Sequence, residues 1–514
     1  MRETDQQIPG ETPLNSQEVE EYKQFVREEI VPEEREKLTD FYSQFVDERR
    51  EGLISMSSGI GAATGSLPLD PTKYDVVSKP KMISRKDEVE AYVNRHLYLQ
   101  MFTHPTINKA RRLFEENELP SKTITKELPV VDELRRQGKA ITFYDLGLGP
   151  KEERLEERIS DSATEILGTR MFTWLTKDVV SYPVILPSMN TVVSSLGLAT
   201  LAIAGTAGFI PIDAQFNDVN NQILMARQAI DYLENDPVVQ ESQDREDIIE
   251  RGRKLIGATL KANPEDALHR VERLLDEGIT TFRVYDPRSL INRMHKTTEV
   301  LTKEYGDKIR LIVGQVAGPN HANILIDAGA DALIIGRADG SSCTTGTVTR
   351  IAPNNAYVAY DVVNNMENPV PVWIDSGLDT PAIAGAFGCG AMMSRLLAGG
   401  TYEQAPVGYY YKTVDGSRVK EYSGEASAQT KCRGGKNNRA GGVMFVEGDV
   451  GYIEIEGDES LSVAGRLFDI LQNYATTLIF LRQPSVHDFQ RFRDPELFKM
   501  EENAKRLSKS YVNS

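Results

Sequence analysis

The chain has 514 residues, 40% of them hydrophobic and 26% charged, so it can bury at least one large core. Its net charge of -17 argues against broad binding to nucleic acid or anionic membranes, although a local basic group can still hold a phosphate. Scattered cysteines and histidines, without CxxC or HExxH spacing, predict neither a disulfide framework nor a zinc site. No apolar run reaches the roughly 18 residues of a membrane-spanning helix, and the polar N-terminus lacks a signal-peptide core, so we expect a cytoplasmic protein.

Residues 1–140 predict a polar, mostly helical extension. Apolar residues recur at helical spacing on both sides of Pro32, and further helical stretches follow near 85–100 and 105–117. The glycine-rich stretch "SMSSGIGAATGSLPLDP" is similar to a phosphate loop, but no strand precedes it and no GK[ST] follows. A surface loop is therefore the better interpretation of this stretch.

From residue 141 to about residue 500, short apolar runs alternate with helical patterns such as "PEDALHRVERLLDEG". Continuous apolar strands indicate burial on both faces, as in a parallel sheet. Eight such runs predict an α/β fold of the (β/α)8 TIM-barrel type; a doubly wound sheet has similar rhythm, but no GxGxxG follows the first strand. Residues 501–514 form a C-terminal tail. The runs are "YPVILP", "AGFIPI", "KLIGAT", "TTFRVYD", "IRLIVGQ", "DALIIG", "VPVWID" and "GAMMSR".

Polar residues at the ends of these runs form a candidate active site, because barrel chemistry lies where the strands end. One loop, "ADGSSCTTGTVT", places Cys343 among small and hydroxylated residues, whereas a structural thiol would have apolar neighbours. Each polar residue alone could be ordinary loop, but their joint position after successive strands indicates a site. The set comprises Ser188, Met189, Asn190, Asp286, Arg288, Gly314, Gln315, Asp375, Ser376, Gly377, Ser394 and Arg395.

The motif "GSSCTT", Gly340 to Thr345, resembles the catalytic loop of the IMP dehydrogenase/GMP reductase family. "ITFYDLGLGP", "VILPSMNTV", "LIVGQVAG", "VWIDSGL" and "LLAGGTYEQAPVGYYYKTVDGSRVKEYSGEAS" resemble further family segments in the same order. The resemblance implies a TIM barrel that acts at C2 of a purine nucleoside monophosphate with NAD or NADP. It also implies a homotetramer as the default assembly.

The resemblance also implies roles for individual residues. Cys343 would be the nucleophile toward C2, which suits a thiolate because it attacks well and leaves well. Asp375 would accept the two ribose hydroxyls, and Arg395 would either bind the phosphate or point outward in an ion pair. The remaining substrate-binding residues are Met189, Ser341, Gly377, Ser394 and Tyr422. The cofactor site comprises Asp286, Gly314 and Gln315. A structural role remains the alternative for Cys343; Cys389 is expected between helix and strand, and Cys432 in a flap.

Several positions depart from the family pattern. The loop that helps to bind potassium reads "GRADGS" here, so a potassium ion held by carbonyls of Gly340 and Cys343 is left open. Asn190 replaces an aspartate, Ser376 replaces a glycine, and Glu425-Ala426 replaces the family's Met-Gly or Met-Ser, so the natural substrate could differ from IMP or GMP. The interval from Asp213 to Lys254 is too short for regulatory CBS modules. We expect its acidic stretch "YLENDPVVQESQDREDIIERGRK", residues 232–254, to form a helix and a loop.

The flap, about residues 425–458, bears on the reaction. It contains Arg433 and Arg439 but no Arg-Tyr pair of the kind that activates water in the dehydrogenases. "NNRAGGVMFVEG" resembles the reductase flap, and Glu447 with Thr345 would then handle the proton for ammonia release. This favours GMP reductase, with IMP dehydrogenase as the alternative. A nucleotide-binding paralogue without turnover is a second alternative, motivated by the substitutions and opposed by the retained cysteine motif.

Overall fold

The computed structural model describes residues 85–118, 125–157, 163–286, 289–336, 343, 354–404, 410–412, 418–424, 427, 450–454 and 462–500. The predictions made for residues before 85, for residues 501–514 and for most of the flap lie outside these ranges.

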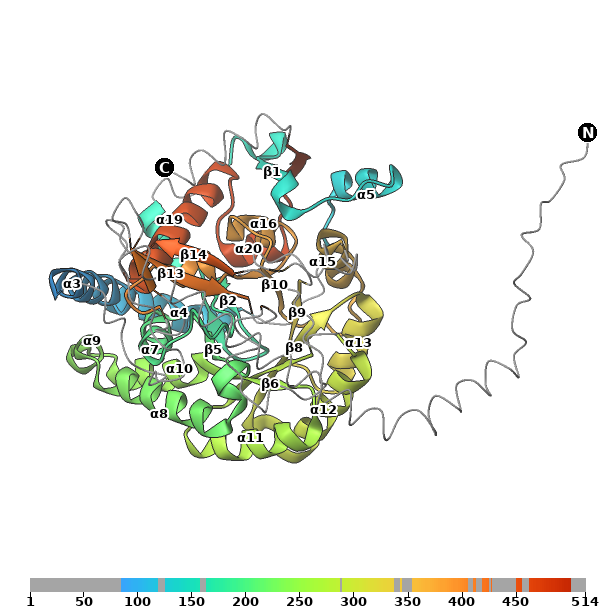
Figure 1. The fold of residues 1–514 in the computed structure, drawn as a ribbon. Helices are drawn as coiled ribbons and strands as arrows, with labels where there is room; N and C mark the ends of the chain where they lie inside the picture. The colour runs from blue at the N-terminus through green and yellow to red at the C-terminus, as the bar shows by residue number, and fades with distance from the viewer. Residues whose placement is uncertain are drawn as a thin grey trace, which may run out of the picture.

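Within the described residues, eight parallel strands form the central barrel (Figure 1). Consecutive strands from the second to the eighth are hydrogen-bonded neighbours, and the eighth also pairs with the first. A parallel bridge between Leu186 and Gly208 joins the first strand to the second and closes the barrel. The side chains of the strands are almost all buried, as expected for strands covered on both faces. The predicted TIM barrel and its eight apolar runs are confirmed. The strands are β4 (Val184–Ile185), β5 (Gly208–Ile210), β6 (Ile256–Lys261), β7 (Thr281–Tyr285), β8 (Arg310–Val316), β9 (Ala332–Ile335), β10 (Val372–Asp375) and β11 (Gly390–Met392).

Helices cover the outside of the barrel between these strands. The predicted helix after β6 shows why: the Asn263 side chain caps the amides of Glu265 and Asp266, and Pro264 occupies the first turn. Between β5 and β6 the chain forms a short 3₁₀ turn, η3 (Ala214–Asn217), and three helices. The stretch 232–254, predicted as a helix and a loop, contains the end of the first of these helices and nearly all of the other two. The helices of this layer are α7 (Ser195–Ala204), α8 (Val219–Asn235), α9 (Pro237–Glu241), α10 (Arg245–Leu255), α11 (Pro264–Asp276), α12 (Ile291–Tyr305), η4 (Gly306–Lys308), α13 (Pro319–Asp327), α15 (Asn355–Asn365), α16 (Pro381–Ala386), α17 (Arg395–Ala398) and α19 (Val463–Phe480).

The N-terminal ends of the barrel strands are closed by a hairpin of β2 (Thr173–Trp174) and β3 (Val180–Ser181). Its turn bonds to the beginning of β10, where Trp373 Nε1 donates to the Leu175 carbonyl at 3.1 Å. Lys177 pairs with Asp331, just before β9, at 2.9 Å. The opposite, C-terminal end of the barrel is therefore where a site can open.

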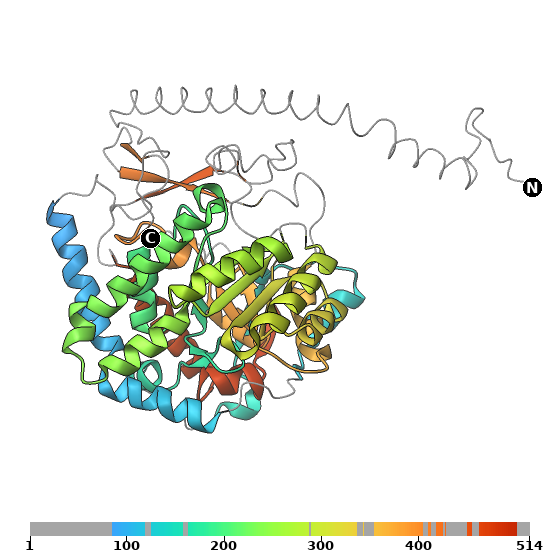
Figure 2. The same ribbon diagram turned by 90° about the horizontal axis from the view of Figure 1, so that it is seen from below.

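Two helices precede the barrel, α3 (Arg85–Phe102) and α4 (Pro105–Asn117), as predicted for these stretches. Helix α3 lies along the side of the barrel, whereas α4 runs across the end that the β2–β3 hairpin closes (Figure 2). Helix α3 packs against α7 and α19. Its Arg95 pairs with Asp236 at 2.6 Å and donates from Nε to Thr200 Oγ1 at 2.7 Å. The guanidinium thereby ties α3 to two elements of the barrel layer.

The remaining elements lie around the barrel ends. Strand β1 (Leu146–Gly149) pairs antiparallel with β15 (Glu496–Lys499), which joins distant parts of the chain. An antiparallel sheet of β12 (Tyr410–Lys412), β13 (Arg418–Ser423) and β14 (Val450–Glu454) lies beyond one end of the barrel (Figure 2). None of the described helices has the length and apolar character needed to cross a membrane. The other short elements are α5 (Pro129–Arg136), η1 (Phe143–Asp145), η2 (Glu152–Arg154), α6 (Ala163–Thr169) and α20 (Val486–Arg491).

Candidate active site

Asp375 is the last residue of β10, and its carboxylate is the centre of a polar network at the C-terminal end of the barrel. Its Oδ2 accepts hydrogen bonds from Arg283 Nη2 at 3.1 Å and from Gln315 Nε2 at 3.4 Å. Its Oδ1 accepts from Ser376 Oγ at 3.1 Å. The side chain of Asp375 is 13% exposed, so its carboxylate can still contact a ligand. The structure thus brings together two predicted site residues, Asp375 and Gln315.

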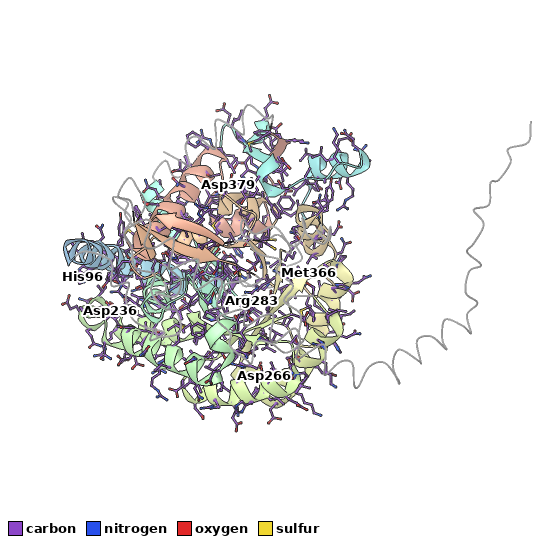
Figure 3. The ribbon with its side chains drawn as sticks, in the orientation of Figure 1. His96, Asp236, Asp266, Arg283, Met366 and Asp379 are labelled. Carbon is purple, nitrogen blue, oxygen red and sulfur yellow. The ribbon has the colours of Figure 1, made fainter. Side chains whose placement is uncertain are left out.

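Arg283 is a site residue that the sequence reasoning missed. It lies in the middle of β7, between the buried Phe282 and Val284, and its side chain is 3% exposed. Its Nη1 donates to Ser188 Oγ, which follows β4, at 3.1 Å. Its Nη2 donates to Asp375, which ends β10. The guanidinium therefore crosses the barrel interior, where Figure 3 places it. The sequence feature that could have indicated Arg283 was a charged residue within the apolar run "TTFRVYD".

Backbone geometry holds Asp375 in place. Ser376 and Gly377 both have left-handed φ values, 72° and 74°, and the Ser376 amide donates to the Met392 carbonyl at 3.1 Å. A left-handed conformation costs a non-glycine residue about 1–2 kcal/mol. Gly336, at the end of β9, has a φ of 126°, and a Cβ there would lie 2.3 Å from the Asp375 carbonyl oxygen. Only glycine allows β9 to approach Asp375 this closely.

A second cluster joins three residues of the predicted substrate site. Ser394 Oγ and Tyr422 Oη are 2.7 Å apart, and the Tyr422 hydroxyl lies 3.4 Å from Met189 Sδ. Ser394 follows β11, Met189 follows β4, and Tyr422 belongs to β13. Because β4 and β11 are adjacent in the barrel, this cluster places the β12–β14 sheet over the C-terminal end.

The predicted cofactor residues lie at the ends of two adjacent strands, β7 and β8, which pair Tyr285 with Gly314. Asp286 is buried, and its Oδ1 accepts from the Leu290 amide at 3.4 Å. Packing alone requires Gly314, because a Cβ there would lie 2.6 Å from the Ile334 carbonyl oxygen. A carboxylate and a carboxamide at neighbouring strand ends supply the acceptor and donor groups that a nicotinamide carboxamide would need.

Two other predicted positions show contrasting environments. Arg395 is exposed at the first residue of α17, and it forms no ion pair with any residue in the described part of the chain. Asn190 is buried, and neither atom of its side-chain amide has a hydrogen-bond partner among the described residues.

The two described cysteines also differ. Cys343 is half-buried, and the residues on both sides of it lie outside the described ranges. Cys389 is buried between α16 and β11, its thiol lies 3.6 Å from the Phe387 carbonyl oxygen, and burial raises the pKa of that thiol. The predicted packing role of Cys389 is confirmed. The other residues singled out in the cysteine loop and flap lie outside the described residues, namely Ser341, Gly340, Thr345, Glu425, Ala426, Cys432, Arg433, Arg439 and Glu447, as does Arg288.

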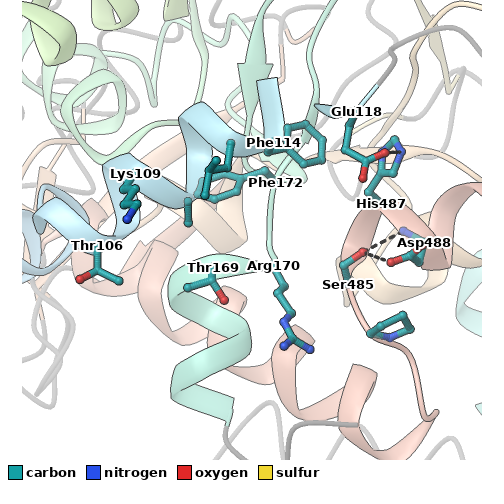
Figure 4. Close-up of a pocket in the computed structure, with 13 residues that line it drawn as sticks. Thr106, Lys109, Phe114, Glu118, Thr169, Arg170, Phe172, Ser485, His487 and Asp488 are labelled. Carbon is teal, nitrogen blue, oxygen red and sulfur yellow. Dashed lines mark hydrogen bonds and ion pairs between the residues drawn. The ribbon is translucent and has the colours of Figure 1, made fainter. Parts of the chain in front are cut away.

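A pocket of about 590 Å³ lies elsewhere, between α4, α6 and the start of α20 (Figure 4). Phe114 and Phe172 line it, Glu118 pairs with His487 at 3.0 Å, and the Ser485 hydroxyl donates to Asp488. It adjoins the β2–β3 hairpin at the closed end of the barrel, so it is separate from the Asp375 network. Within the described ranges, no group of three or more His, Cys, Asp and Glu side chains could hold a metal ion.

The fold and the polar groups at the ends of its strands define an α/β barrel with a binding site at the C-terminal mouth. Comparison with known proteins agrees with the motifs. Residues 140–478 match the model of the IMP dehydrogenase / GMP reductase domain. This match covers more than half of the chain, and the protein therefore belongs to that family, whose members are NAD(P)-dependent oxidoreductases of purine nucleotides.

Similar proteins include inosine-5'-monophosphate dehydrogenase 1 of Arabidopsis thaliana, 28% identical over 40% of this chain and 41% of that protein. The inosine-5'-monophosphate dehydrogenase of Mycobacterium bovis is 35% identical over 36% of this chain and 35% of its own length. That of Nitrosopumilus maritimus is 29% identical over 44% of this chain and 47% of its own length. The chain thus aligns with less than half of each of these relatives.

Proposed function

We propose that this protein is an NAD(P)-dependent oxidoreductase that acts at C2 of a purine nucleoside monophosphate through a covalent adduct with Cys343. The observation that supports it best is the convergence of Asp375 and Gln315, and of Met189, Ser394 and Tyr422, at one end of the barrel. These residues come from family motifs far apart in the sequence, and they gather on the side of the barrel to which the cysteine loop leads.

The chain's own residues would divide the work. The Cys343 thiolate adds to C2, and the bond between C2 and the leaving group breaks with help from a proton that Glu447 and Thr345 handle. Asp286 and Gln315 would hold the nicotinamide cofactor, which would supply the hydride for C2 when bound. The carbon–sulfur bond to Cys343 then breaks, which restores the thiolate. For the reductase, GMP, NADPH and protons give IMP, NADP⁺ and ammonium. Asp375 orients the ribose, and the amides near Ser341 and Met393 hold the phosphate.

The flap sequence favours GMP reductase, because it has a reductase-like "AGGV" and Glu447 in place of an Arg-Tyr pair. IMP dehydrogenase is the second candidate, and it is favoured by the similarity to inosine-5'-monophosphate dehydrogenases. A homotetramer in the cytoplasm is the arrangement that we propose for either activity.

Absorbance of the reduced nicotinamide decides between the two reactions. The protein is incubated with GMP, IMP or XMP in turn, each with NAD or NADPH. We expect NADPH oxidation with GMP, slowed roughly 10²-fold or more in Glu447→Gln, the scale of general acid–base catalysis. NADH formation from IMP, with a burst of one equivalent in Arg433→Ala or Arg439→Ala and no reaction with GMP, would make the protein a dehydrogenase.

Intact mass spectrometry separates both enzymes from a nucleotide-binding paralogue. Incubation with the purine monophosphate should increase the protein mass by a covalent adduct, and Cys343→Ala should not show it. Binding without an adduct and without turnover would contradict the proposed activity.

A further inference from the structure

The proposed reaction gives no role to Arg283, although this is a charged side chain in the interior of the barrel. Burying a cation is costly unless a partner and hydrogen bonds compensate. Arg283 has Asp375 at 3.1 Å, Ser188 at 3.1 Å, and the ring of Tyr285, whose centroid lies 4.9 Å from Cζ. All three partners come from strands or strand ends that face the barrel interior. These contacts therefore hold the guanidinium of Arg283 in a defined position within the candidate site.

The acceptor capacity of Asp375 shows what Arg283 does. An ionised carboxylate offers about four lone-pair positions, two on each oxygen. Arg283 and Gln315 occupy both positions of Oδ2, while Ser376 occupies one position of Oδ1. These three residues leave one acceptor position of Asp375 unoccupied, and it lies on Oδ1. A vicinal diol that donates both of its hydroxyls to the carboxylate needs two acceptor positions.

We infer that Arg283 determines the sugar specificity of the site, so that Asp375 recognises only one of the two ribose hydroxyls and deoxyribonucleoside monophosphates are accepted as ligands. This inference rests on the proposed function, because it takes a purine nucleoside monophosphate as the occupant. Gln315, at 3.4 Å, holds Oδ2 weakly, whereas the Arg283 bond is ionic and buried. Arg283 therefore keeps one acceptor position of Asp375 Oδ2 occupied.

Equilibrium binding tests this without requiring turnover. Titration calorimetry would compare GMP and IMP with their 2′-deoxy and 3′-deoxy forms. In the wild-type protein one deoxy form should bind within about threefold of the ribonucleotide. The other should bind about tenfold or more weakly, since it lacks a hydrogen bond to a charged group.

Arg283→Met removes the guanidinium and keeps an unbranched apolar stem. It frees Oδ2, so both deoxy forms should then bind about tenfold or more weakly than the ribonucleotide. Arg283→Lys keeps a cation beside Oδ2 and should retain the wild-type pattern. Arg270→Met is the matched control, because Arg270 is equally buried but pairs with Asp266 outside the site. It should leave the sugar preference unchanged.

The wild-type measurement needs no variant, so a folding defect in Arg283→Met cannot obscure the result. Strong loss with both deoxy forms in the wild-type protein would overturn the inference, as would an unchanged pattern in Arg283→Met or a methionine-like pattern in Arg283→Lys. In those cases nucleotide binding itself still supports the proposed function. Absence of binding by every nucleotide would overturn the proposed function and this inference together.

Discussion

Two buried arginine–carboxylate pairs, one at the side of the barrel and one inside it, use the same chemistry differently. Arg95 and Asp236 are 2.6 Å apart with side chains 5% and 4% exposed, and Asp236 also caps the Val238 amide at 2.9 Å. Arg283 and Asp375 are 3.1 Å apart, but Asp375 is 13% exposed. Figure 3 shows Asp236 at the edge of the molecule and Arg283 near the centre. The enclosed pair fastens a helix, whereas the partly open pair leaves a carboxylate facing the mouth.

A third buried cation belongs with the first pair. Lys126 donates to the Phe489 carbonyl at 2.8 Å and lies 3.2 Å from Asp494. Burial lowers the pKa of Lys126 to about 8, against the opposing effect of Asp494. Like Arg95, it connects a segment that precedes the barrel to a distant part of the chain, here α20 and the residues that follow it. Cations at the side of the barrel should therefore govern stability, and those at the mouth should govern ligand binding.

The largest effect should come from the mouth itself. Cys343→Ala should reduce turnover by roughly 10³-fold or more, because it removes the nucleophile of the covalent step. The dissociation constant of the nucleotide should change by less than about threefold, since binding is assigned to Asp375 and the loop amides. Steady-state kinetics and calorimetry on the same preparation measure the two quantities. Turnover at the wild-type rate would exclude Cys343 as the nucleophile.

Arg95→Met should have the largest effect on stability. It leaves Asp236 and the nearby Glu403 buried without their cation, which costs about 3–5 kcal/mol in free energy of unfolding. Arg283→Met should cost less, about 1–3 kcal/mol, because Asp375 can be hydrated at the mouth. Urea denaturation of the two variants gives the comparison. Equal destabilisation, or altered nucleotide affinity in Arg95→Met at temperatures where it is folded, would remove the distinction between side and mouth.

The pH dependence of stability should identify Lys126. Folding lowers its pKa from 10.5 to about 8, so between these values the unfolded chain binds a proton that the folded protein has released. The free energy of unfolding therefore rises with pH across this window, by at most about 3 kcal/mol. The increase should be seen in the difference between wild type and Lys126→Met, measured by denaturation from pH 7 to about pH 10.5. A constant difference would contradict the lowered pKa.

The smallest effect concerns the turn after β10. Ser376→Gly relieves a left-handed serine and should stabilise the protein by about 0.5–1 kcal/mol, after allowing for the greater freedom of glycine in the unfolded chain. It also frees a lone-pair position on Asp375 Oδ1, so nucleotide affinity should stay the same or increase. Thermal unfolding and calorimetry measure both changes. Loss of stability would show that the Ser376 hydroxyl contributes more than the backbone costs.

Much of the fold and part of the site could be predicted from local patterns. Each barrel strand is a short apolar run because both its faces are buried, and each run is visible without knowledge of its neighbours. Asp375 and Gln315 could be placed at the mouth because they end such runs. The interval between β5 and β6 was only partly predicted: its polar stretch forms helices α9 and α10, whose caps, such as Asp236, are single residues within a charged segment.

The sequence by itself determined the barrel, its family and the positions of the residues that end its strands. Those features depend on periodicity, burial and short motifs, which are local properties of a chain. Only the tertiary structure decided that Arg283 points inward and takes one oxygen of Asp375, 92 residues away, or that Arg95 fastens α3 to the barrel through Asp236. A strand alternates its side chains between two faces, so the sequence leaves open which face a single charge occupies. The partner of a buried charge is fixed only when closure of the barrel brings distant strands together.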